Sequence, residues 1–204
     1  MDTKSLIQIP GYRYNEYLLI LNPHEELRNR IIQIKKEFYD KYKASAALYG
    51  KPHVTLVKFV QFDMMEERLI NSLKTIAMSY YPFKIDLKDF GSYPSHTIFI
   101  NIATKLQVQN LIKELKSAQR LMKINNDNKP HFIDDPHIQV AWKLLPWQYE
   151  QGWLEYSHRH FTGSFIADNM LLIKRRVGEK AYQIVQRFEF MNLPVSIKQG
   201  DLFM

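Results

Sequence analysis

The sequence contains no cysteine, and this absence excludes several kinds of site. Without thiols the chain cannot form a disulfide scaffold, a thiolate zinc site or a cysteine nucleophile. No apolar run approaches the ~18 residues that a membrane-spanning helix needs. Residues 1–11 also lack the apolar core of a secretory signal. We therefore expect a cytoplasmic protein with no membrane partner.

Glycine and proline are also scarce, with 7 and 9 among 204 residues. Together with a hydrophobic fraction of 46%, this scarcity indicates a folded chain with a sizeable core rather than a disordered one. The net charge of +7 favours a polyanionic partner such as RNA or a nucleotide. Many soluble proteins carry such a charge without binding anything, and nothing in the sequence indicates a protein partner.

A short motif occurs twice, as PHVTL from Pro52 and as PHIQV from Pro136. In a strand, residues two positions apart share a face, so each motif presents a histidine and a polar residue on one side and aliphatic residues on the other. Two such strands side by side would place four side chains in one cleft, namely His53 and Thr55 with His137 and Gln139. Such a cleft suits a phosphate held between a proton donor and a proton acceptor.

The elements around the two motifs follow the same order twice. Apolar periodicity predicts strands over 14–21, 53–60, 83–89, 96–103, 165–174 and 182–191 and a further strand that begins at His137. It also predicts helices that begin at about residues 22, 63 and 104, and a fourth over 146–160. Asn22 and Pro23 resemble the N-cap and first residue of the first helix, and 123–136 resembles a polar loop. The repeated order predicts a duplicated α+β fold with two antiparallel-rich sheets, flanking helices and a central cleft. We expect one bilobal domain over 1–204, with lobes near 14–91 and 96–191 that allow for strand exchange.

With these motifs the chain resembles the two-histidine (2H) phosphoesterase superfamily, which includes the 2'-5' RNA ligase-like proteins and cyclic phosphodiesterases. That family carries one His-x-Thr/Ser-x motif in each lobe, where x is hydrophobic. The resemblance extends over nearly the whole chain and implies catalytic roles for His53, Thr55, His137 and Gln139. Gln139 departs from the family pattern, which has a hydroxyl residue there.

Two histidines with pKa values near neutrality can deprotonate a nucleophile and protonate a leaving oxygen without metal. Thr55 and Gln139 would donate to the non-bridging phosphate oxygens. Lys51 and Asp135 each precede a histidine by two residues, and a nearby cation lowers an imidazole pKa while an anion raises it. This pattern predicts His53 as the base and His137 as the acid.

Four residues outside the motifs are candidates for substrate binding. Tyr49 and Lys51 precede the first motif, and Lys174 and Arg176 share one face of a basic strand end. Lys143 lies about 20 Å from His137 in an ideal strand, too far for the scissile phosphate. Trp142, Trp147 and Trp153 are more typical of core or helix packing than of base stacking.

Three functions remain open at this point. The first is a metal-independent phosphodiesterase, a phosphoric diester hydrolase acting on an RNA end or a cyclic or 2'-5'-linked nucleotide, with no cofactor. The second is a catalytically weakened RNA- or nucleotide-binding module of the same fold. The third, less favoured, is a metal site of His131, Asp134 and His137. The chain has no G-x-x-x-x-G-K loop, so ATP-driven ligation is not expected.

Overall fold

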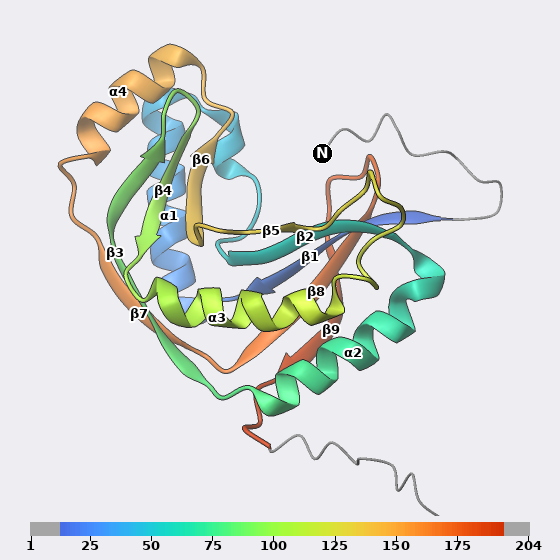
Figure 1. Ribbon diagram of the computed structural model, residues 1–204. Coiled ribbons are helices and arrows are strands. Elements are labelled where there is room, and N and C mark those ends of the chain that lie inside the picture. Colours follow the sequence, from blue (N-terminus) through green and yellow to red (C-terminus); the bar gives the residue numbers. More distant parts are fainter. Residues whose placement is uncertain (1–12, 194–204) are drawn as a thin grey trace, which may run out of the picture.

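The computed structural model describes residues 13–193 (Figure 1). The α-helices are α1 (Glu25–Tyr42), α2 (Glu66–Ser79), α3 (Lys105–Leu115) and α4 (Pro146–Tyr156). Short 3-10 helices are η2 (Ser45–Leu48), η3 (Asp63–Met65) and η4 (Lys116–Ala118). The strands are β1 (Tyr14–Leu21), β2 (Val54–Phe62), β3 (Phe83–Tyr93), β4 (Thr97–Ile102), β5 (His131–Phe132), β6 (His137–Trp142), β7 (Thr162–Ala167), β8 (Asn169–Arg176) and β9 (Gln183–Glu189).

The described strands form one sheet, so the prediction of two separate sheets is wrong, while the α+β class is confirmed. The strand order is β7-β3-β4-β6-β2-β1-β8-β9, and β5 pairs with β2 beside this path. The two histidine strands are neighbours and join the halves of the sheet through one antiparallel pair, Val54 with Ile138. Because β2 and β6 pair only near their N-terminal ends, the two halves diverge from this point, and the sheet is strongly bent (Figure 1).

Each half of the sheet combines strands that are distant in the sequence. β1 pairs with β2 and with β8, which lies near the other end of the described chain, whereas β3 pairs with β4 and β7. The helices are distributed in the same way, because α1 packs on β6, β7 and α4, while α2 packs on β9 and α3. The helices cover the outside of the bend (Figure 1) and leave its concave side to the motif residues.

Several predicted boundaries need correction. The first helix begins at Glu25 with His24 as its N-cap, two residues after the predicted Asn22 cap. The strand predicted over 165–174 is two strands that turn at Asp168, because a continuous apolar pattern does not reveal a tight turn. Helix α4 ends at Tyr156 rather than at His160. The loop over 123–136 contains the short strand β5, which gains its hydrogen bonds from β2.

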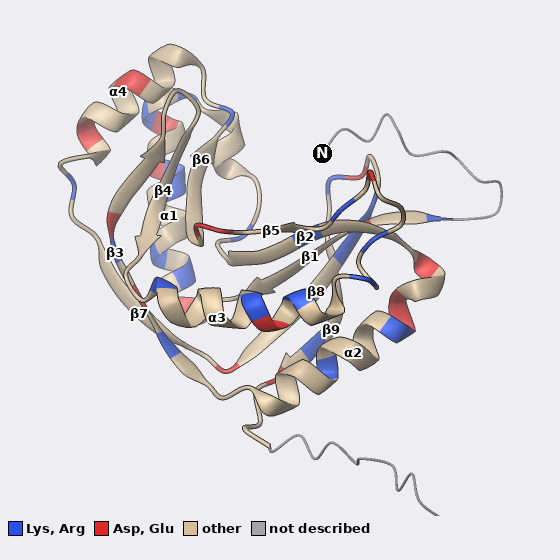
Figure 2. Cartoon of the chain, in the orientation of Figure 1, with Lys and Arg blue, Asp and Glu red and all other residues tan. Residues whose placement is uncertain are grey.

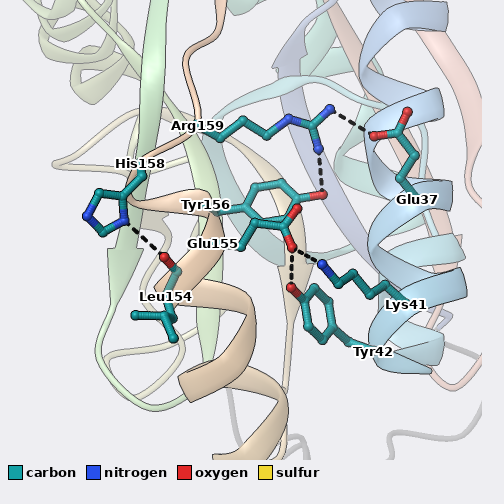
Figure 3. A network of polar contacts seen from close by, with 8 residues as sticks. All are labelled: Glu37, Lys41, Tyr42, Leu154, Glu155, Tyr156, His158 and Arg159. Carbon is teal, nitrogen blue, oxygen red and sulfur yellow. Dashed lines mark hydrogen bonds and ion pairs between the residues drawn. The ribbon is translucent and has the colours of Figure 1, made fainter.

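Helices α1 and α4 are joined by a polar network (Figure 3), and the Phe38 ring of α1 packs against the rings of Tyr42 and Tyr156. Glu155 accepts hydrogen bonds from the Lys41 ammonium at 2.5 Å and the Tyr42 hydroxyl at 2.6 Å. Arg159 donates to Glu37 at 2.8 Å and to the Tyr156 hydroxyl at 3.3 Å. The ion pairs Lys41–Glu155 and Arg159–Glu37 are partly exposed to solvent. Packing of the aromatic rings therefore contributes more to the stability of this interface.

The close approach of α4 to α1 depends on Gly152, which is buried in the middle of α4. A Cβ atom at this position would lie 2.8 Å from two ring carbons of Phe38 and 3.2 Å from Ile98 Cδ1. We expect Gly152→Ala to lower the free energy of unfolding by about 1–3 kcal/mol, despite the gain of about 1 kcal/mol in helix propensity. Urea denaturation checks this, with the exposed neighbour Gln151→Ala as the control. A net stabilisation by Gly152→Ala would contradict the expectation.

Candidate functional site

The concave side of the bent sheet holds a cavity of about 470 Å3 where the two histidine strands meet. Residues from α1, β1, β2, β5, β6 and β8 and from the intervening loops line it. They are Leu18, Lys35, Tyr49, His53, Thr55, Lys58, His131, Ile133, His137, Gln139, Trp142, Lys143, Arg175 and Tyr182. All four motif side chains therefore share one cavity.

Both motif imidazoles are oriented by the same local contact. His53 Nδ1 lies 2.8 Å from the Lys51 carbonyl oxygen, and His137 Nδ1 lies 2.7 Å from the Asp135 carbonyl oxygen. The intervening proline restricts the backbone on both sides of itself, which helps to fix the carbonyl two residues before each histidine. Since a carbonyl oxygen only accepts, Nδ1 carries the proton that it receives. This leaves Nε2 of each imidazole to exchange a proton with a ligand.

Lys35 of α1 is the cation that acts on His53. This residue is 5% exposed, and its ammonium donates to the carbonyl oxygens of Tyr49 at 2.9 Å and Gly50 at 2.8 Å. Burial lowers the pKa of Lys35 to about 8. Lys35 therefore holds the segment that leads into the His53 strand, and it faces the same cavity.

The surroundings of His137 combine aromatic packing with an anion. Its ring centroid lies 4.5 Å from that of Phe99 and 5.4 Å from that of Tyr93. The Asp135 carboxylate accepts from Lys105 at 2.6 Å and from the Tyr93 hydroxyl at 3.0 Å. Burial acts to raise the pKa of Asp135, but these two hydrogen bonds together with the charges of Lys105 and His137 outweigh it, and the pKa is lowered. These contacts hold the Asp135 backbone and the His137 ring in place.

Burial lowers the pKa of both motif histidines. For His53 the hydrogen bond to the Lys51 carbonyl opposes this lowering of the pKa, and the charge of Lys35 adds to it. For His137 the hydrogen bond to the Asp135 carbonyl and the Asp135 charge oppose the lowering of the pKa without cancelling it. The sequence predicted that the charge of Lys51 lowers the pKa of His53. In the structure the cation that lowers this pKa is Lys35 of α1, whereas Lys51 acts on His53 through its backbone carbonyl.

Thr55 and Gln139 are available to a ligand. Thr55 is half-buried and Gln139 is exposed. Within residues 13–193 neither side chain makes a hydrogen bond. A threonine hydroxyl and a glutamine amide can each donate to a phosphate oxygen.

A β-bulge in each histidine strand brings a further residue into the cavity. On β2, Ile20 and Leu19 pair with Thr55 and Val57, so the intervening residue has no partner and the alternation shifts. Lys58 then faces the same side as Thr55, although an ideal strand would place it on the opposite face. A matching shift on β6 places Trp142 on the face of Gln139. The sequence pattern alone does not reveal these bulges.

The other predicted binding residues lie in different environments. Tyr49 lines the cavity, and Lys143, which was expected to be distant from the scissile phosphate, also lines it. Lys51 is exposed and is absent from the cavity wall. Lys174 bonds Glu66 at 2.6 Å on the outer face of β8, and Arg176 is exposed and outside the wall.

Arg175 lines the cavity in place of its two neighbours on β8. It is on the same face as Leu171 and Ile173, which pack with Leu18 and Ile20 on the floor of the concave side. Its guanidinium bonds Glu16 and lies 4.6 Å from the centre of the Tyr182 ring. A run of three basic residues gives no signal as to which one faces inward, because the face depends on the pairing of β8 with β1.

No group of three His, Asp or Glu side chains within residues 13–193 is arranged to hold a metal ion, so the alternative site of His131, Asp134 and His137 gains no support. The carboxylate of the neighbouring residue Asp135 is already engaged by Lys105 and Tyr93.

Within residues 13–193, no helix combines the length and apolar character needed to cross a membrane. Lys and Arg are spread over several helices and strands (Figure 2).

Comparison with known proteins agrees with this geometry. The family described as the 2'-5' RNA ligase superfamily matches residues 23–179. The structure is similar to that of E. coli LigT complexed with 3'-AMP, with a TM-score of 0.62, 16% identity, and coverage of 87% of this chain and 98% of that one. It is also similar to the structure of a protein from Thermus thermophilus, with a TM-score of 0.59, 15% identity, and coverage of 86% and 98%. No curated protein sequence matches the chain.

Proposed function

Because the chain belongs to the 2'-5' RNA ligase superfamily, we propose that it is a metal-independent phosphodiesterase acting on an RNA-related or nucleotide diester. The observation that carries this proposal is the pair of imidazoles in one cavity, each tied through Nδ1 to a backbone carbonyl. That arrangement leaves two Nε2 atoms facing a shared ligand. Two such groups supply both of the proton transfers that cleavage of a diester requires.

The reaction follows from the two protonation states. His53, neutral at Nε2, accepts a proton from water as the water oxygen forms a bond to phosphorus. The bond from phosphorus to a ribose oxygen breaks, and His137 donates its Nε2 proton to that oxygen. A 2',3'-cyclic phosphate or a 2'-5' linkage fits this scheme. The assignment of base and acid follows the nearest charges, which are the Lys35 ammonium for His53 and the Asp135 carboxylate for His137.

Donors around the cavity stabilise charge on the phosphate in the transition state. Thr55 and Gln139 lie on the same faces as the histidines and have no competing partner within residues 13–193. Lys35 adds a charge that is held in place by two carbonyl oxygens. Preorganised donors of this kind lower a barrier without reorganising during the reaction.

The ligands of related structures agree with a nucleotide substrate. Structures of E. coli LigT, at 14–16% identity to this chain, contain 3'-AMP, ATP, NADP+ or phosphate. All of these molecules carry phosphate, as a scissile diester does. We therefore expect phosphate-bearing nucleotides to occupy the cavity of this chain.

Hydrolysis of a panel of diesters in the presence of EDTA tests the proposal. The panel comprises 2',3'-cyclic nucleotides, 2'-5'- and 3'-5'-linked dinucleotides and 3',5'-cyclic nucleotides. We expect turnover of at least one member by the wild-type protein and none by the His53→Ala/His137→Ala double variant. Turnover that disappears in EDTA and returns with a divalent metal would overturn the metal-independent mechanism.

A second candidate, a binding module with weakened turnover, is favoured by Gln139. The glutamine amide is longer and more mobile than the hydroxyl at the equivalent family position, and it is exposed here. In this case the cavity would bind RNA or a nucleotide with salt-sensitive affinity and cleave it slowly or not at all.

Gln139→Thr distinguishes the two candidates. If the module describes this chain, we expect the substitution to raise kcat by about tenfold or more, because a shorter donor approaches the phosphate with less loss of side-chain entropy. The panel assay measures this, with Gln33→Thr on the exposed face of α1 as the control. Fast turnover by the wild type, unchanged or reduced in Gln139→Thr, would exclude the weakened module.

A further inference from the structure

Lys58 and His131 form a pair at one end of the cavity that the proposed mechanism does not use. They are partners in the short pairing of β2 with β5. Side chains of paired residues in neighbouring strands share a face and lie close together, and both of these line the cavity. Within residues 13–193 Lys58 has no carboxylate partner, and neither side chain makes a hydrogen bond.

The β2 bulge directs Lys58 toward this end of the cavity. Leu18 pairs with Lys58 and Ile20 pairs with Thr55, and the two partners on β1 share a face. Bulges are common beside functional sites, where they redirect a side chain. Here the bulge places a half-buried cation in the cavity wall that a regular strand would have placed in the core.

Lys58 is the cation free to bind a ligand at this end. Arg175, which lines the cavity nearby, is engaged by the buried Glu16 carboxylate at 2.7 Å and stacks on Tyr182. β2 and β6 run in opposite directions from the pair that joins them. Lys58 of β2 and the Trp142–Lys143 segment at the end of β6 therefore lie on opposite sides of the histidines.

The spacing indicates a second phosphate rather than a second contact to the scissile one. Lys58 lies three residues beyond Thr55, but the bulge leaves their β1 partners Leu18 and Ile20 only two residues apart, so the two residues are about 7 Å apart along the strand at ~3.3 Å per residue, and Lys58 lies farther still from His53. A phosphate held by the two histidines forms hydrogen bonds of ~3 Å. A donor displaced along the strand in this way is better placed for a neighbouring phosphoryl group.

We propose that Lys58 and His131 form a second phosphate subsite, so that the ligand carries another phosphoryl group beside the one held by the histidines. The subsite rests on the proposed function only in that the histidine pair marks the position of the scissile phosphate. The lysine supplies the charge, and the imidazole of His131 supplies a hydrogen bond on the same side.

Binding of adenosine 3'-monophosphate and adenosine 3',5'-bisphosphate to the whole protein tests this by calorimetry, because neither ligand contains a diester to be cleaved. We expect the wild type to bind the bisphosphate about tenfold more tightly, which corresponds to ~1.4 kcal/mol. Lys58→Met should reduce this ratio to about one and leave the Kd of the monophosphate unchanged. Lys74→Met, an exposed lysine of α2, is the matched control and should keep the full ratio.

Two further variants keep the test valid if Lys58→Met fails to fold. His131→Phe should lower the same ratio, and Lys58→Arg should largely retain it. The proposal is overturned if the wild type binds both ligands equally, or if Lys58→Met weakens both by the same factor.

Two sources of the second phosphate are separated by a further comparison. A terminal 5'-phosphate is represented by the bisphosphate, and an internal diester by the dinucleotide ApA with a 3'-phosphate. The ligand whose affinity depends more strongly on Lys58 identifies the source. Failure of the subsite is distinct from failure of the proposed function, since the latter is decided by the histidine variants in the hydrolysis assay.

Discussion

His53→Ala and His137→Ala are each expected to lower kcat on a diester substrate by at least ~10²-fold, the usual contribution of a general acid or base. The physical reason is that each imidazole is tied to a backbone carbonyl through Nδ1 and keeps Nε2 for one of the two proton transfers. Steady-state kinetics on the best member of the diester panel measures the loss. His96→Ala is the matched control, because His96 also bonds a carbonyl two residues back, at 2.9 Å, but lies outside the cavity wall.

The identity of the leaving group separates the two roles. A nucleoside p-nitrophenyl phosphodiester releases a phenolate that needs no proton, so removing the general acid costs little on this substrate. We therefore expect His137→Ala to retain most of its activity there, whereas His53→Ala remains impaired. The opposite result would exchange the roles of the two histidines, and full activity of both variants on natural diesters would end the two-histidine mechanism.

The second large effect is expected in the pH dependence of kcat/KM. Burial lowers the pKa of both histidines below the ordinary value of 6.5. The base must be neutral, which requires a pH above its pKa, and the acid must be protonated, which requires a pH below its pKa. The optimum should then lie on the acid side of pH 6.5, and the rate should fall by about tenfold per pH unit at higher pH. An optimum above pH 7.5 in the free enzyme would contradict this.

Variants of the neighbouring charges should move the two limbs of that profile separately. Lys35→Met removes a cation that lowers the pKa of His53, so the acidic limb should move to higher pH. Asp135→Asn removes an anion that raises the pKa of His137, so the alkaline limb should move to lower pH. Lys36→Met, an exposed neighbour of Lys35, should leave both limbs unchanged. NMR titration of the imidazoles gives the same comparison without turnover.

The element order and the motif were accessible from local patterns. Strict alternation around His53 and His137 predicted two strands with the correct inward-facing residues, and helical spacing of Leu27, Ile31 and Phe38 predicted α1. The first-turn acids Glu25 and Glu26 stabilise this helix through its dipole. Local sequence carries this information because period-2 and period-3.6 burial follow from the geometry of each element alone.

The local sequence patterns could not predict that the strands form one sheet rather than two. A single backbone pair, Val54 with Ile138, joins the two halves of the described sheet. The sequence separation of 138 − 54 = 84 residues carries no periodic signal for such a contact. The exchange of β8 into the half that contains β1 has the same origin, since strand pairing depends on distant residues.

The sequence by itself determined the two histidine motifs, their alternation and their family, because these depend on residues within a few positions of one another. Only the tertiary structure decided what surrounds the histidines. Lys35 reaches His53 from α1, and bulges opposite β1 and β4 turn Lys58 and Trp142 into the cavity. The physical reason is that a bulge and a helix docking angle are set by the partner strand and the core, so the face on which a side chain lies is decided by contacts far away in the chain.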